Sequence, residues 1–68
     1  MRLPDTKDLR KVDIYEHVPL VGPFELRFYP DDAYFSIITA EGKVCCDGLL
    51  IGPEKAVEPL LNYLRARA

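Results

Sequence analysis

The stretch AYFSIITAEGKVCCDGLL, residues 33–50, carries the strongest structural signal in this chain. It contains two segments rich in β-branched, aromatic and other apolar residues, separated by the dipeptide Glu41-Gly42. Such residues favour strands, and glycine supplies the positive φ that a tight turn needs. We therefore predict a β-hairpin with a two-residue loop, in which Ala40 faces Lys43 and the pairing continues outward in the same register. A slightly longer loop is the alternative, because Glu41 is a poorer first turn residue than Asn or Asp.

This register assigns alternate side chains to the two faces of the hairpin. One face is almost entirely apolar and is expected to lie under a helix. Its predicted members are Ala33, Phe35, Ile37, Thr39, Val44, Cys46 and Leu50. The opposite face is mixed, but it carries an apolar strip formed by Tyr34, Ile38, Cys45 and Leu49. One helix cannot cover both faces, so the strip is either a tolerated patch of exposed apolar residues or an interface. We predict an interface, with a second copy of the chain or with another protein.

The sequence outside the hairpin supplies two further strands and the helix. Residues 10–18 and 24–29 alternate between apolar and polar side chains, which predicts half-buried strands. Downstream, apolar residues recur at three- and four-residue spacing, which predicts an amphipathic helix. They are Val57, Leu60, Leu61 and Leu64. Pro59 is compatible only with the first turn of that helix, which places the start near Ala56 or after a short preceding turn.

The predicted fold is therefore α+β. We expect an antiparallel sheet of about four strands, a β-β-β-β-α meander, with one C-terminal helix packed on one face. The 68 residues form a single small domain, residues 1–68, in which residues 1–9 are a loose lead-in. Within the fourth strand, Gly48 indicates a bulge or a close approach of two backbones.

Composition and charge exclude several classes of function. The net charge is −2 and its signs are interleaved, which disfavours nucleic-acid binding because that needs clustered Lys and Arg. The apolar runs are far shorter than the ~20 residues of a membrane span, so no membrane association is expected. Cys45 and Cys46 are adjacent and close no useful loop, and no signal-peptide core is apparent, so a cytoplasmic location is the interpretation.

The residues offer little catalytic chemistry. His17 is the single histidine and is expected on the surface, while Ser36 lies in the middle of a predicted strand, where it is a poor nucleophile. Cys45 is expected beside Lys43, which would lower the pKa of its thiol and permit a thiol-dependent reaction. The sequence predicts no catalytic residues and no cofactor. It also predicts no metal ligands, because neighbouring cysteines on a strand point to opposite faces and cannot easily share one tetrahedral ion.

The hairpin also resembles two known families. The stretch RFYPDDAYFSIITAEGKVCCDGLL is similar to the core of the YunC-like family of uncharacterised proteins. The matching positions are Pro30, Phe35, Gly42, Val44, Cys46 and Leu49. Two positions depart from that pattern, since Lys43 replaces an aromatic residue and Asp47 replaces a glycine. The family is longer than this chain, and the resemblance implies an α+β fold and little about activity.

The segment GKVCCDG, residues 42–48, resembles a strand in the repeat unit of the TATA-binding protein family. That resemblance implies a half-saddle that binds nucleic acid, which a homodimer would complete. The acidic composition opposes it. The leading prediction is a small non-enzymatic protein-binding or regulatory module that self-associates through its sheet. The nucleic-acid-binding half-saddle and a thiol-dependent enzyme or redox protein using Cys45 are the alternatives.

Overall fold

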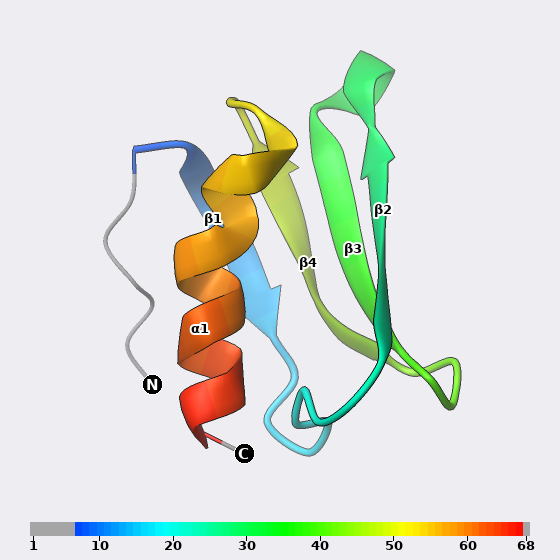
Figure 1. The fold of residues 1–68 in the computed structure, drawn as a ribbon. Coiled ribbons are helices and arrows are strands. Elements are labelled where there is room, and N and C mark those ends of the chain that lie inside the picture. Colours follow the sequence, from blue (N-terminus) through cyan, green and yellow to red (C-terminus); the bar gives the residue numbers. More distant parts are fainter. Residues whose placement is uncertain (1–6, 68) are drawn as a thin grey trace.

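The computed structural model describes residues 7–67 as four strands, two short 3₁₀ turns and one α-helix (Figure 1). The elements are β1 (Leu9–Ile14), β2 (Phe24–Tyr29), the turn η1 (Pro30–Asp32), β3 (Tyr34–Thr39), β4 (Val44–Leu50), the turn η2 (Glu54–Val57) and α1 (Glu58–Arg67). The predicted fold class is confirmed, since a four-stranded antiparallel sheet is followed by a C-terminal helix. Of the predicted lead-in, residues 1–6 lie outside the described residues, and Leu9 already begins β1.

The order of the strands differs from a simple meander. The sheet has the order β1-β4-β3-β2, so three consecutive strands form hairpins and β1 lies beside the last of them, as in a Greek key. The predicted strand 10–18 ends early, because the Val18 N–H donates to the Tyr15 carbonyl in a turn. The chain then crosses the end of the sheet, and the Pro-rich connection is too long for a tight β1–β2 hairpin.

The β3–β4 hairpin has a three-residue loop, one residue longer than predicted. Thr39 and Lys43 are joined by a backbone hydrogen bond of 2.8 Å, and Gly42 adopts a φ of 85°. The register of the two strands then shifts by one residue. Ile38 faces Val44, but the next pair is Ile37 and Cys46, which is the predicted register. Cys45 is the extra residue of this β-bulge, which offsets the longer loop.

The helix packs on one face of the sheet and completes the core. The 3₁₀ turn ahead of α1 confirms the predicted late start, and Pro59 is the second residue of the α-helix, where its missing N–H costs nothing. The fully buried side chains come from β3, β4, η2 and α1. The largest are Phe35, Ile37, Leu50, Leu60, Leu64, Val57, Cys45 and Cys46. The apolar face predicted for the hairpin is thus largely confirmed, but the bulge turns Val44 outward and leaves it 38% exposed.

The C-terminal arginines also tie the helix to the rest of the fold. The Arg65 guanidinium lies over the Phe24 ring, 5.2 Å from its centroid, and Arg67 Nη2 donates to the Glu16 carbonyl at 2.8 Å. These contacts join the end of α1 to β2 and to the β1–β2 connection. Among residues 7–67, no helix has the length and apolar character required to cross a membrane.

Candidate functional site

The face of the sheet opposite α1 carries a mixed layer of tyrosine, charged and apolar side chains. The strand register arranges them in three rows, each of which crosses the sheet in the order β1, β4, β3, β2. The rows are Lys11, Leu49, Tyr34 and Tyr29; then Asp13, Asp47, Ser36 and Arg27; then Tyr15, Val44, Ile38 and Glu25. We call this surface the open face. Its middle row is polar, and its outer rows hold the apolar residues.

The predicted interface strip is only partly on this face. Three of its members lie there, namely Tyr34, Ile38 and Leu49. Cys45 does not, because the bulge buries it completely, and Val44 occupies the corresponding place beside Ile38. The polar row containing Asp47 and Ser36 separates the two apolar pairs. The strip is therefore not continuous, which weakens it as a contact surface.

Two tyrosines donate hydrogen bonds to one carboxylate at the centre of the open face. The Tyr34 hydroxyl donates to Asp47 Oδ2 at 2.5 Å and the Tyr15 hydroxyl to Asp47 Oδ1 at 3.1 Å. Asp47 on β4 thereby joins β3 to the residue that follows β1. The hydrogen bond to Asp47, together with desolvation, raises the pKa of Tyr34 to about 12, and the same carboxylate raises the pKa of Tyr15.

Alkaline titration should reveal this cluster. Tyr34 binds its proton more tightly in the folded chain than in the unfolded chain, whose tyrosines titrate near 10. Its contribution to stability is therefore complete below pH 10 and is lost as the pH rises towards about 12. We expect Asp47→Asn to return the tyrosinate absorbance of Tyr34 and Tyr15 to the ordinary range. Asp13→Asn is the control, and an unchanged Tyr34 titration in Asp47→Asn would contradict the assignment.

The structure does not favour thiol chemistry at Cys45. Its side chain is 0% exposed, and its thiol donates to the Val18 carbonyl with Sγ at 2.9 Å from the oxygen. Desolvation raises the pKa of Cys45 even though the Arg67 guanidinium lowers it, and desolvation raises the pKa of Cys46 to about 12. The predicted activation of Cys45 by a neighbouring lysine on an exposed face is therefore wrong. Both cysteines pack as small core residues.

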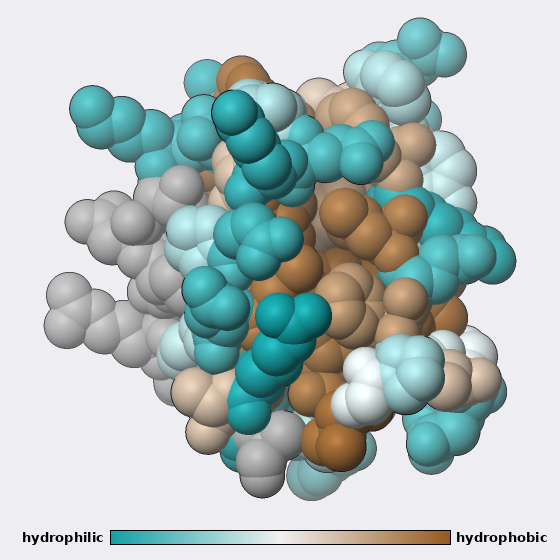
Figure 2. All heavy atoms as spheres, in the orientation of Figure 1, coloured by the Kyte–Doolittle hydropathy of each residue, from teal (hydrophilic) through white to brown (hydrophobic). Residues whose placement is uncertain are grey.

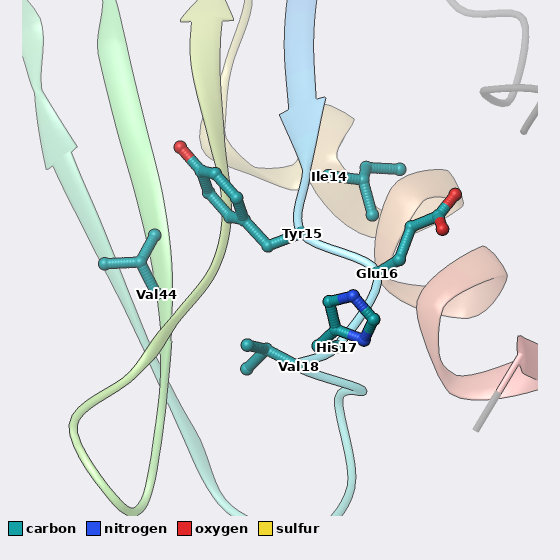
Figure 3. Close-up of a pocket in the computed structure, with 6 residues that line it drawn as sticks. All are labelled: Ile14, Tyr15, Glu16, His17, Val18 and Val44. Carbon is teal, nitrogen blue, oxygen red and sulfur yellow. The ribbon is translucent and has the colours of Figure 1, made fainter.

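A shallow pocket of about 600 Å³ lies where β1 ends. It is lined by Ile14, Tyr15, Glu16, His17, Val18 and Val44 (Figure 3). Tyr15, Val18 and Val44 surround the hollow, whereas Glu16 points away from it. His17 lies in an exposed turn, as predicted for a surface imidazole. Across residues 7–67, no group of three or more His, Cys, Asp or Glu side chains is arranged to hold a metal ion.

The two edges of the sheet differ. At the β1 edge, the pairing with β4 shifts register between Leu9 and Lys11, whereas β2 pairs with β3 without irregularity along its six residues. On the helix side, β2 carries three half-buried apolar side chains, Phe24, Leu26 and Phe28. On the open face, Glu25 and Arg27 form an exposed ion pair along the same strand. β2 is the last strand of the sheet, and its outer edge has no neighbouring strand in the described part of the chain.

Sequence reasoning identified β2 as an alternating strand but did not single it out as a site. The signal was present in the segment FELRF, residues 24–28, but its importance depends on β2 being an edge strand. In a meander, β2 would lie between β1 and β3, and both of its backbone edges would be hydrogen-bonded to neighbouring strands. Comparison with protein-family models, with curated proteins and with solved structures gave no match. The two family resemblances therefore remain expectations from the sequence.

Proposed function

We propose that this chain is a small non-enzymatic binding module that associates with a second copy of itself through its sheet. The observation that supports this most strongly is the apolar sheet surface that one helix leaves uncovered. Figure 2 shows apolar atoms at the surface beside the helix, between its polar outer side and the polar groups at the far edge of the sheet. On this side of the sheet, β2 leaves Phe24, Leu26 and Phe28 only half-buried.

Chain length gives the physical reason for self-association. A domain of 68 residues buries a smaller fraction of its surface than a larger domain does, so its own core provides limited stability. Association with a second copy adds buried apolar area without requiring a longer chain. Half-buried side chains such as Phe24 and Phe28 gain from such a contact, because each still exposes apolar surface that a second copy would cover.

The two alternative functions have less support. A nucleic-acid-binding surface needs clustered positive charge, but the centre of the open face places Asp13 directly beside Asp47. A thiol-dependent reaction needs an accessible thiolate, but burial of Cys45 raises its pKa. Both observations favour the binding module over the alternatives.

Solution mass tests the proposed self-association. We expect sizing chromatography with light scattering to show a concentration-dependent dimer, and a weak self-association corresponds to a Kd on the order of micromolar. The measurement should extend from about 1 µM to about 1 mM chain, which brackets that range. The mass of a single chain at every concentration would contradict self-association and leave a different protein as the partner to seek.

A further inference from the structure

The outer edge of β2 lacks the features that usually prevent strands from pairing between molecules. Natural edge strands are protected by bulges, prolines or lysines that oppose further pairing. The β1 edge has such protection, with a register shift at Leu9 and the basic residues Arg10 and Lys11. β2 has six regular residues without a bulge, and its prolines, Pro23 and Pro30, lie outside them. Its two charges are of opposite sign, so they oppose pairing with a second copy less than the two basic residues of β1 do. A second strand can therefore form a backbone ladder along β2.

The sequence of β2 is complementary to itself in the antiparallel direction. When two copies pair with Leu26 opposite its own counterpart, each Phe24 faces a Phe28, and each Glu25 faces an Arg27. Every apolar residue then meets an apolar residue, and every charge meets its opposite. Shifting the register by one residue would place apolar side chains opposite charged ones. Shifting it by two would place Arg27 opposite Arg27 or Glu25 opposite Glu25, so the pattern favours one alignment.

Both faces of the sheet benefit from this alignment. On the helix side, the half-buried row of Phe24, Leu26 and Phe28 gains the partner's matching row as a neighbour. On the open face, Glu25 and Arg27 already form an ion pair within one chain, and the guanidinium has further N–H groups to donate. Pairing would join the four charges of two copies into one network.

The helix does not block this edge. In Figure 1, α1 lies in front of β1, and β2 forms the opposite side of the sheet. The contact between Arg65 and the Phe24 ring lies at the start of β2, on the helix side of the sheet rather than along its outer edge. Within residues 7–67, an approaching strand therefore meets the backbone of β2 without displacing a helix or strand.

From this geometry we infer that two copies of the chain pair β2 against β2, with the two-fold axis at Leu26, and join their four-stranded sheets into one of eight strands. This inference rests on the proposed self-association and specifies its contact. It differs from an interface through the predicted strip, which would stack one open face on another.

Charge reversal at the two exposed positions tests the register. In Arg27→Glu both positions are acidic, and in Glu25→Arg both are basic, so each homodimer contains two like-charge pairs directly across the ladder. We expect either change to raise the dimer Kd at least about tenfold. An equimolar mixture of the two variants should restore a dimer, because the acidic edge then meets the basic edge. The double variant Glu25→Arg/Arg27→Glu should also dimerise.

Controls separate the fold from the contact. Both positions are exposed, and their intrachain ion pair contributes little to stability, so circular dichroism and melting should remain close to those of the parent chain. Leu49→Asp probes the open face and should leave the dimer intact. If the parent chain dimerises while both reversals do so equally well, or if Leu49→Asp abolishes the dimer, pairing through β2 is overturned and self-association stands. If the parent chain is a monomer throughout, both proposals fail.

Discussion

Replacing Gly48 by alanine is expected to unfold the chain or to detach β1 from the sheet. A Cβ atom at this position would lie 2.0 Å from the Lys11 carbonyl oxygen and 2.8 Å from Val12 Cα. Both are backbone atoms, so no side-chain rotation relieves the clash, and β1 must move away from β4. The sequence prediction of a close backbone approach at Gly48 is confirmed by this geometry.

We expect Gly48→Ala to lower the free energy of unfolding by about 3–5 kcal/mol, in the range of the most damaging single substitutions. A domain of this size is stabilised by roughly 3–10 kcal/mol in total, so much of the population should be unfolded. Urea denaturation followed by circular dichroism measures the effect. Gly22→Ala is the matched control, because Gly22 has a φ of 76° and nothing within 4 Å of the added Cβ. Gly22→Ala should lower the free energy of unfolding by about 1–2 kcal/mol through backbone strain alone. If the two variants lose the same free energy of unfolding, the proposed clash at Gly48 is contradicted.

Replacing Phe35 by alanine is expected to have a comparable effect through the core. Phe35 lies on the inner strand β3, is 0% exposed and faces Phe28 on one side and Gly48 on the other. Removing a fully buried aromatic ring loses its transfer free energy and leaves a cavity, which together cost about 3–5 kcal/mol. Both inner strands and the helix enclose this position, so the structure cannot close over the space easily.

The urea midpoint of Phe35→Ala should fall sharply relative to the parent chain, whereas Leu49→Ala should shift it little, since Leu49 is on the open face. The slope of the transition should remain similar if the variant still unfolds in one step. Equal midpoints for the two variants would show that Phe35 does not anchor the core. The measurement should be made at one chain concentration, because association with a second copy adds stability by mass action.

The elements of this fold were largely predictable because the strongest signals are local. Alternation over residues 24–29 and the β-rich segments of 33–50 predicted three strands, and leucine spacing predicted the helix. Pro59 also limited where the helix could begin, since proline is tolerated only in its first turn. Each of these inferences depends on residues within a few positions of one another.

The open face was predicted less well because its composition depends on the register at the hairpin. A loop one residue longer than expected should have exchanged the faces, but the bulge at Cys45 restored the register beyond it. The result is that Cys45 is buried, Val44 is exposed, and the predicted strip is interrupted by polar residues. The extra loop residue and the bulge compensate each other in strand register. Which combination forms depends on how both faces of the sheet pack, and no short stretch of sequence specifies that.

Amino-acid order alone specifies the number and kind of elements, the apolar face that lies under the helix and the self-complementary pattern of β2. Three features emerge only when the strands assemble. These are the pairing of β1 with β4, the hydrogen bonds from Tyr15 and Tyr34 to Asp47, and the position of β2 at an edge. The difference comes from the range of the interactions. Local propensity and periodicity act within an element, whereas strand order and bonds between distant side chains depend on how the whole chain closes around one core.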